Sequence, residues 1–168
     1  MDPIAHDHQL RALLKAHLSR CMRDDDLVVD EFSLAYGKSR ADLALVNGHL
    51  EGFEIKAGKD TLERLGGQVD AYVKIFEYSW VVTTQGHLAD VRALVPRNWG
   101  LLVAVTDLAG NHLRQVRKAQ PNRKRDAEHL VRLLWRDEAW AKLEELGLSK
   151  GLKTKPKLAL FAVLAQAL

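Results

Sequence analysis

Apolar and polar residues alternate along the chain in two different periods, one typical of helices and the other of strands. The first apolar stripe has helical spacing and indicates a helix that begins at Asp2-Pro3, where a capping residue precedes a proline. A strand is expected over 27–35, and two further strands, over 40–46 and 53–56, are expected to form a hairpin. The stripe of the first helix consists of Leu10, Leu13, Leu14, His17, Leu18 and Cys21.

The rest of the chain alternates helices with strands and then becomes purely helical. Asp60 and Glu63 have the spacing of a capping box, which predicts the start of a helix. We expect an α/β fold, a mixed central β-sheet flanked by helices over 1–118, with a C-terminal helical extension over 119–168 packed on this core. The predicted elements are helices over 61–77, 87–95 and 156–168, strands over 78–84 and 101–106, a short last strand after a turn at 109–111, and one helix or a bent pair around 130–140.

The length of the hairpin turn decides which side chains share a face. A two-residue turn over 47–48 would place Asp42 and Glu54 on opposite faces of the sheet. A three-residue loop over 46–48, with a left-handed glycine, places both on one face together with Lys56. The apolar residues of the two strands then share the other face, so we predict the three-residue loop. Those apolar residues are Leu43, Leu45, Phe53 and Ile55.

The polar face of the hairpin carries two carboxylates and a lysine. Residues i and i+2 of a strand point to the same side, so Glu54 and Lys56 emerge next to each other. Asp42 and Glu54 can hold a hard divalent cation through their oxygens, and the ammonium group of Lys56 can act on a nucleophilic water or a phosphate. This combination favours phosphodiester hydrolysis. The alternative is a group of three surface charges, although aspartate is disfavoured inside a strand.

The predicted helix over 61–77 directly follows the strand that carries Glu54, so its N-terminal half should pack near the polar face of the hairpin. Gln68 and Tyr72 lie four residues apart and share one side of this helix. Arg64 lies one turn earlier on the same side. We therefore expect these side chains to reach the site. The alternative is a helix face that meets solvent, with Tyr72 half-buried.

The order of these residues resembles the PD-(D/E)XK nuclease superfamily. The acid at Asp42, the Glu-Ile-Lys sequence at 54–56 and the Gln-Val-Asp-Ala-Tyr sequence at 68–72 are similar to its core and to the QxxxY motif of its RecB-like members. Arg-Ala-Asp before the turn and Gly-Phe-Glu-Ile-Lys after it also resemble a small, poorly characterised bacterial and phage branch. The resemblance extends over 27–84 and implies a restriction-endonuclease-like core. Ala41 stands where the superfamily commonly has proline.

The resemblance implies a role for each residue of the site. Asp42 and Glu54 would ligate Mg²⁺ or Mn²⁺, with the carbonyl of Ile55 as a backbone ligand. Lys56 would orient or deprotonate the attacking water and stabilise charge on the transition state. Two helix residues would position Lys56, the metal ligands or the scissile phosphate. They are Gln68 and Tyr72.

Many members of the superfamily carry a further glutamate earlier in the chain, often in the first helix. The predicted first helix contains no glutamate. The resemblance therefore makes Glu31, on the first strand, the acid that we expect as an additional metal ligand, with Asp30 as its rival. Glu31 alternates with Phe32 and Leu34 along the strand and so avoids the face that those residues bury.

Positive charge is concentrated in the C-terminal part of the chain. Residues 111–157 contain thirteen Lys or Arg and six Asp or Glu, against 25 and 22 in the whole chain. Such a field attracts phosphate backbones, so DNA is the expected partner. A solvated helical face is the alternative. The residues expected to bind nucleic acid are Lys38, Arg40, Lys59 and Arg64 around the site, and Arg123, Lys124 and Arg125 in the basic part.

Composition narrows the setting of the protein. A chain that is 47% hydrophobic and 28% charged is typical of a soluble globular protein. The single cysteine, Cys21, cannot form an internal disulfide and lies on the apolar stripe, which indicates a buried thiol in a reducing compartment. No secretory signal or membrane span is visible, so we expect a cytoplasmic protein with no membrane partner. Trp135 and Trp140 lie beside apolar residues at helical spacing and are expected in the core, with base-stacking platforms for nucleic acid as the alternative.

The leading hypothesis is a Mg²⁺- or Mn²⁺-dependent deoxyribonuclease that hydrolyses phosphodiester bonds through Asp42, Glu54 and Lys56. The alternatives are a catalytically silent nucleic-acid-binding module with the same fold, and a subunit whose activity needs partners. A homodimer that places two sites on opposite strands is compatible with the small size of the domain. Single-stranded, double-stranded and branched substrates, and endo- and exonucleolytic cleavage, are all open.

Overall fold

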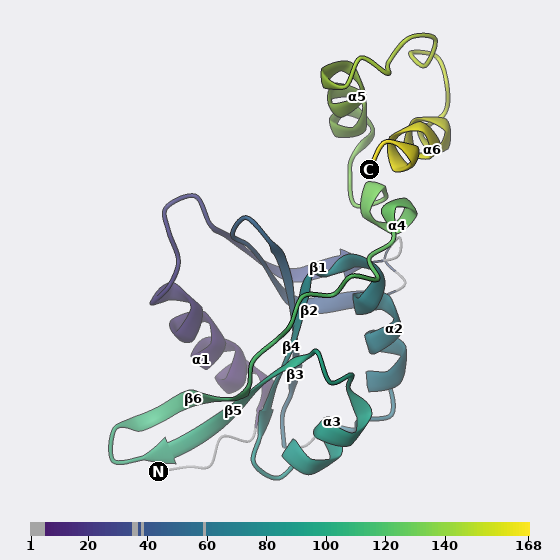
Figure 1. The fold of residues 1–168 in the computed structure, drawn as a ribbon. Coiled ribbons are helices and arrows are strands. Elements are labelled where there is room, and N and C mark those ends of the chain that lie inside the picture. The colour runs from purple at the N-terminus through teal and green to yellow at the C-terminus, as the bar shows by residue number, and fades with distance from the viewer. Residues whose placement is uncertain (1–5, 35–36, 38, 59) are drawn as a thin grey trace.

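The computed structural model of the chain describes residues 6–34, 37, 39–58 and 60–168. Strands and helices alternate over most of the chain, and three helices follow them (Figure 1). None of the helices in these described residues has the length and apolarity needed to cross a membrane. The elements are α1 (Asp7–Ser19), β1 (Leu27–Leu34), β2 (Ser39–Val46), β3 (Leu50–Lys56), α2 (Leu65–Ile75), β4 (Tyr78–Thr84), α3 (Leu88–Leu94), β5 (Gly100–Asp107), β6 (Gly110–Arg117), α4 (Ala127–Val131), α5 (Arg136–Glu145) and α6 (Lys157–Gln166).

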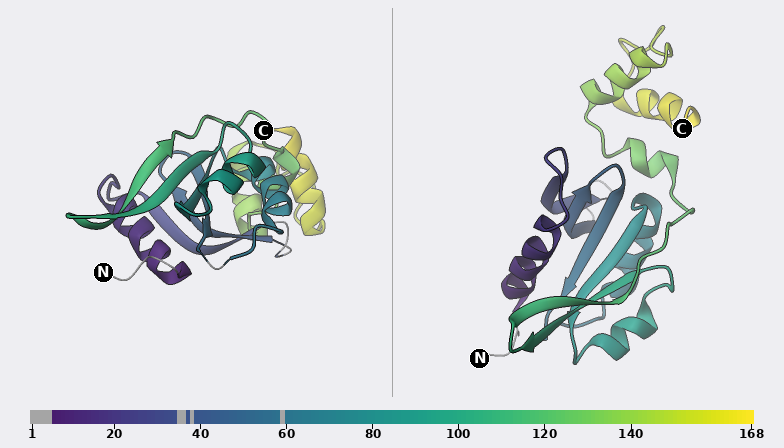
Figure 2. Two further views of the ribbon diagram at one scale, coloured as in Figure 1. Left: turned by 90° about the horizontal axis from the view of Figure 1, so that it is seen from below. Right: turned by 60° about the vertical axis from the view of Figure 1, so that its left-hand side comes forward.

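The strands lie side by side in the order in which they follow along the chain, from β1 to β6. β1, β2 and β3 are antiparallel neighbours, as are β5 and β6. β3, β4 and β5 are parallel, and α2 and α3 connect them because parallel neighbours need a crossover. Helix α1 covers one face of the sheet, and α2 and α3 cover the other (Figures 1 and 2). The predicted α/β fold with a mixed sheet is confirmed.

Each face of the sheet has its own apolar cluster. Phe53 and Ile55 of β3 belong to the cluster under α1. The alternate residues of β3 point to α2, and Gly52 allows the ring of Phe76 to approach the strand, since a Cβ at Gly52 would lie 2.4 Å from that ring. β3 therefore separates a purely apolar face from a face that carries the polar side chains of the predicted site.

The hairpin between β2 and β3 has a three-residue loop, as predicted, but the loop comprises 47–49 rather than 46–48. Val46 pairs with Leu50 on either side of it. Gly48 has a φ of 89°, the left-handed conformation that glycine adopts without strain. The difference changes the partner of each residue by two positions, so the apolar residues Leu43, Leu45, Phe53 and Ile55 still share one face, in the cluster under α1.

Strand β1 buries one face before Glu31 and the opposite face after it. This residue has a φ of 54°, a left-handed conformation that is uncommon outside glycine. Before it, Val28 packs against the cluster under α1. After it, Phe32 and Leu34 pack in the cluster under α2 and α3. Residues two apart in a regular strand point to the same side, so the backbone at Glu31 turns β1 over, opposite Asp42.

Several helices differ from the prediction at their ends, and the difference at the start of α2 is four residues. Asp60 does not cap α2, because its carboxylate accepts a hydrogen bond from the backbone N–H of Ala57 at 2.7 Å. The helix begins at Leu65 instead. The predicted start of the first helix, at 2–3, lies outside the described residues. Cys21 follows the end of α1 and is exposed, so the prediction of a buried thiol is wrong.

The C-terminal extension is a helical unit with an apolar cluster of its own. α4 lies against α2, and α5 and α6 stand beyond α4, away from the sheet (Figures 1 and 2). The predicted helix or bent pair is two helices, α4 and α5, separated at 132–135. Trp140 packs against the cluster, but Trp135 is 75% exposed, so its predicted place in the core is wrong. The cluster consists of Val131, Ala139, Leu143, Leu160, Phe161 and Leu164.

Candidate functional site

β2 and β3 separate at the position of Asp42. Their pairing ends at Leu43 and Phe53. Beyond this pair, Oδ2 of Asp42 accepts a hydrogen bond from the backbone N–H of Ile55 at 2.7 Å. The carboxylate thus satisfies a backbone donor that the ladder no longer reaches. Asp42 is therefore fixed between the two strands, with its side chain 24% exposed.

Glu54 is buried on the face of the sheet that α2 covers, and three donors meet at its carboxylate. Nζ of Lys56 lies 2.8 Å from Oε1, and Nε2 of Gln68 donates to the same oxygen. The hydroxyl of Tyr72 donates to Oε2 at 2.8 Å. The strand period places Lys56 beside Glu54, and the helical period lets Gln68 and Tyr72 reach it together. The structure thus brings these four predicted residues together.

Burial sets the charge behaviour of the two acids. Burial raises the pKa of Glu54, and the neighbouring charge of Asp42 raises it further. Burial also raises the pKa of Asp42, against the hydrogen bond from Ile55 and the charge of Arg11. Burial raises the pKa of Tyr72 well above its ordinary value, so its hydroxyl stays protonated and remains a donor. Both acids are therefore harder to ionise than in water, and positive charge beside them favours their ionised form.

The oxygen atoms at this site fit a small divalent cation. Asp42 and Glu54 provide carboxylates, and Oε1 of Gln68 is buried with no hydrogen-bond partner among the described residues. Among the described residues, no group of three or more acidic, His or Cys side chains is placed to hold a metal. Mg²⁺ suits such a sparse set, because it keeps several waters and binds one or two carboxylates together with phosphate oxygens. Asp42, Glu54 and the predicted carbonyl of Ile55 are the groups that would hold it.

A cleft of about 1050 Å³ opens over the two acids. Most of the predicted site residues lie in its lining, although they come from β1, β2, β3, the segment leading into α2 and the first turn of α2 itself. Tyr72 lies behind Glu54 and is fully buried, so it acts on the site only through that carboxylate. The predicted residues that line the cleft are Glu31, Arg40, Asp42, Glu54, Ile55, Lys56, Arg64 and Gln68.

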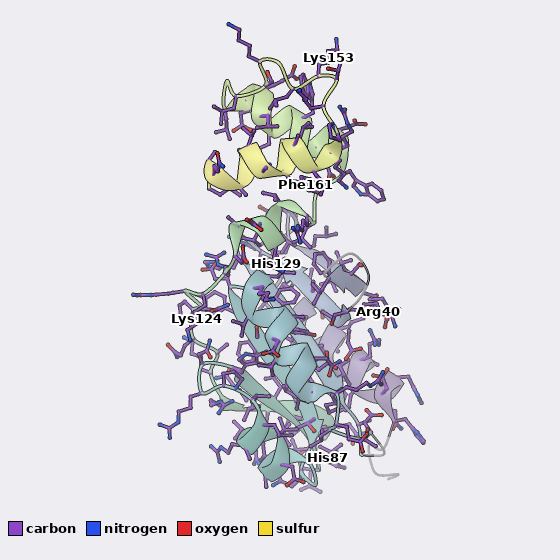
Figure 3. The ribbon with its side chains drawn as sticks, turned by 90° about the vertical axis from the view of Figure 1, so that its right-hand side faces the viewer. Arg40, His87, Lys124, His129, Lys153 and Phe161 are labelled. Atoms are coloured by element: carbon purple, nitrogen blue, oxygen red, sulfur yellow. The ribbon has the colours of Figure 1, made fainter. Side chains whose placement is uncertain are left out.

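The residues predicted to bind nucleic acid divide into two groups. Arg40 and Arg64 line the cleft. The basic run over 123–125 is exposed in the segment between β6 and α4 and is not part of the described lining. Figure 3 shows Arg40 and Lys124 on opposite sides of α2, so the run belongs to a different surface. The two predicted residues that lie outside the described part of the chain are Lys38 and Lys59.

The sequence pattern did not point to Arg11, which lies on α1 next to Asp42. Its guanidinium is 3.0 Å from Oε1 of Glu31 and 3.5 Å from Oδ1 of Asp42. The only local signal is the spacing of four residues between Asp7 and Arg11, which is typical of an ion pair along a helix. Glu31 lies near Asp42 as expected, but Arg11 and Arg40 already hold its two oxygens.

The comparison with known families covers most of the chain. Residues 5–166 match the family described as bacteriophage P4 protein cII. The chain belongs to this cII family. It is 33% identical to protein cII of Enterobacteria phage P4 over 91 residues, which are 54% of this chain and 34% of that relative. The cII-family chain therefore spans about a third of the length of the curated relative that it matches.

The fold of this cII-family chain also has a counterpart among solved structures. It is similar to the SPO1766 protein of unknown function from Silicibacter pomeroyi, with a TM-score of 0.53 and 18% sequence identity. The similarity covers 88% of this chain and 92% of the other. At this level of identity the likeness extends to the fold alone.

Proposed function

We propose that this member of the cII family is a metal-dependent nuclease that hydrolyses phosphodiester bonds in DNA. The observation that carries the proposal is the buried carboxylate of Glu54, held by a lysine, a glutamine and a tyrosine in the cleft that also contains Asp42. Two acids and a lysine in one cleft suit phosphoryl transfer, where negative charge has to be stabilised. The resemblance to the PD-(D/E)XK superfamily supports the same reaction.

The ammonium group of Lys56 acts next to the scissile phosphate in this proposal. Its side chain is 7% exposed and lies 2.8 Å from Glu54, so it is held in one place. From there it orients the attacking water and stabilises the negative charge that develops on the phosphate oxygens. Gln68 and Tyr72 fix Glu54 and, through it, the lysine. Mg²⁺ or Mn²⁺, when bound by the two acids, supplies charge that polarises the phosphodiester and activates water.

DNA binding in this proposal uses the two basic surfaces for different purposes. Arg40 and Arg64 line the cleft, where they meet phosphates close to the reacting bond. The basic run over 123–125 lies on the other side of α2 and contacts the DNA backbone away from the reacting bond. Contacts of this kind position the nucleic acid without reading its sequence. The resemblance implies that the products end in 5′-phosphate and 3′-hydroxyl groups.

A catalytically silent or partner-dependent module is the second candidate function. Lys56, Gln68 and Tyr72 already use three of the roughly four acceptor positions of the Glu54 carboxylate. The described residues also contain no group of three acids or histidines placed around a metal. The chain spans about a third of the length of its relative from phage P4, so a further segment or partner is compatible with the family. A titration with Mn²⁺ separates the two candidates, because a silent module does not need to bind it.

The test of the proposal is cleavage of labelled linear, circular, single-stranded and branched DNA with Mg²⁺ or Mn²⁺. Wild type is compared with Lys56→Ala. Lys142→Ala is the matched control, since Lys142 lies on α5 and pairs with Glu145. We expect metal-dependent cleavage by wild type and control, and a loss of about a hundredfold or more in Lys56→Ala.

Two other results have distinct meanings. No cleavage of any substrate, with Mn²⁺ and DNA both bound, would favour the partner-dependent module. No binding of either would rule out the catalytic proposal. The set of substrates that is cut also assigns the preference for single-stranded, double-stranded or branched DNA.

A further inference from the structure

Arg11 uses its whole guanidinium group on the α1 side of the cleft. Nη1 donates to the carbonyl of Asp42 at 2.5 Å and to Asp30 at 3.4 Å. Nη2 lies 3.0 Å from Glu31 and 3.5 Å from Oδ1 of Asp42. Nε donates to Asp7 at 3.4 Å. A guanidinium has five N–H donors on three nitrogens, and each of these nitrogens has oxygen partners here.

Nη2 lies between the carboxylates of Glu31 and Asp42, which is the position that a cation bridging these two acids would take. Glu31 reaches this position through its left-handed backbone, with a φ of 54°. Such a conformation costs free energy and persists where the surrounding structure requires it. The second oxygen of Glu31 is held by Arg40. The pair of acids is therefore built around a positive charge, and the guanidinium of Arg11 supplies that charge.

We propose that Arg11 is a positioning residue that takes the place of a second metal cation. The inference rests on the proposed function, in which Asp42 and Glu54 bind one divalent cation from the side of the cleft. Arg11 is not among the described residues of the lining, so it holds Asp42 from the side of α1 without touching the substrate. It fixes the metal count at one and keeps Glu31 as its counter-ion rather than as a metal ligand.

The charges around Asp42 explain why the count stays at one. A guanidinium beside the carboxylate repels a further divalent cation at that short range. Without the arginine, Glu31 and Asp42 face each other with no cation between them. Two such carboxylates are ligands for Mg²⁺ or Mn²⁺, so the loss of Arg11 opens a second metal position.

The test counts Mn²⁺ ions per chain by isothermal titration calorimetry and by electron paramagnetic resonance of free Mn²⁺, without DNA. Wild type should bind one ion, and Arg11→Ala two. Arg11→Ala combined with Glu31→Gln should return the count to one. Lys15→Ala is the matched control and should bind one ion, because Lys15 lies one turn further along α1 and pairs with Asp30 at 2.5 Å. A merely structural role of Arg11 would not add an ion.

Glu31→Gln alone provides a second test that does not depend on the folding of Arg11→Ala. The Glu31 side chain is 42% exposed, so the substitution is compatible with the fold. Because Glu31 is not a ligand in wild type, the count should stay at one and the affinity for Mn²⁺ should fall less than about threefold. Loss of a metal ligand or of a residue that supports one costs about tenfold or more.

The outcomes separate this inference from the nuclease proposal. Two ions in wild type, one ion in Arg11→Ala, or a tenfold loss of affinity in Glu31→Gln would each overturn the role of Arg11 and leave the nuclease proposal standing. If wild type binds no Mn²⁺, the role of Arg11 is overturned together with the metal site, and the cleavage assay then decides the nuclease proposal on its own.

Discussion

The two walls of the cleft hold their carboxylates in different ways. On the α2 wall, Glu54 is 2% exposed and is bound by side chains from its own strand and from α2. On the α1 wall, Asp42 is 24% exposed, and its partners are the guanidinium of Arg11 and a backbone N–H of β3. The α2 wall therefore depends on burial and hydrogen bonds inside the core, whereas the α1 wall depends on ion pairs near solvent. Substitutions on the two walls should differ accordingly.

The largest contrast is expected in stability. Tyr72→Ala removes a fully buried ring from the α2 wall and should lower the free energy of unfolding by about 3–5 kcal/mol. Lys15→Ala removes an ion pair with Asp30 beside the α1 wall, whose side chains are 46% and 42% exposed, and should cost at most about 0.5 kcal/mol. Urea denaturation followed by circular dichroism measures both. Similar losses in the two variants would remove the proposed difference between the walls.

A smaller loss is expected when only the hydroxyl of Tyr72 is removed. Tyr72→Phe keeps the ring but leaves Oε2 of Glu54 without its donor, which should cost about 1–2 kcal/mol. Cleavage should slow as well, because Glu54 then holds Lys56 less firmly. Tyr78→Phe on β4, whose ring contacts His49, is the matched control for both measurements. An unchanged rate and stability in Tyr72→Phe would mean that the hydroxyl does not support the site.

The raised pKa of Glu54 gives a pH-dependent difference between wild type and Glu54→Gln. A carboxyl group whose pKa is higher in the folded than in the unfolded state adds stability at acid pH, and this stability is lost as pH rises through the folded pKa. Without divalent cations, the stability of wild type should therefore fall relative to Glu54→Gln as pH rises from about 4 towards neutrality. Denaturant titrations at several pH values measure this difference. If wild type instead became more stable relative to Glu54→Gln as pH rises, the result would contradict the raised pKa of Glu54.

The smallest effect on catalysis is expected from the basic run, which lies on neither wall. Replacing Arg123, Lys124 and Arg125 by alanine should weaken DNA binding and lower the slope of log K against log salt by roughly one for each phosphate that the variant no longer neutralises. The cleavage rate at saturating DNA should stay the same, because the run lies away from the cleft. Fluorescence anisotropy over a range of salt concentrations measures the slope, with Lys142→Ala as control. A slower rate at saturating DNA would place the run next to the reacting bond.

The α2 wall was predictable from the sequence because its spacings are local. The period of a strand places Lys56 beside Glu54, and the period of a helix places Gln68 and Tyr72 on one side. The apolar alternation of β2 and β3 fixed the faces of the hairpin even though the loop comprises 47–49 rather than the predicted residues. In each case, neighbours within a few residues decide the geometry.

The α1 wall could not be predicted in the same way because its contacts are distant in sequence. Arg11 reaches the carbonyl of Asp42 across 31 residues. Arg11 also pairs with Glu31, the residue at which β1 reverses, and Glu31 adopts a left-handed conformation that local propensity disfavours outside glycine. Trp135 shows a related limit: helical spacing identifies an apolar side of a helix, but does not say whether another element covers it.

The most direct test of the proposed metal-dependent nuclease site is the rate of DNA cleavage under single-turnover conditions at increasing Mg²⁺ concentrations. Wild type is compared with Asp42→Asn and with Asp137→Asn, an exposed acid in the first turn of α5 that is not among the described residues of the cleft. We expect cleavage by wild type and Asp137→Asn that rises with Mg²⁺ and saturates, and no cleavage by Asp42→Asn at any concentration. Cleavage without a divalent cation, or cleavage by Asp42→Asn at the wild-type rate, would contradict the proposal.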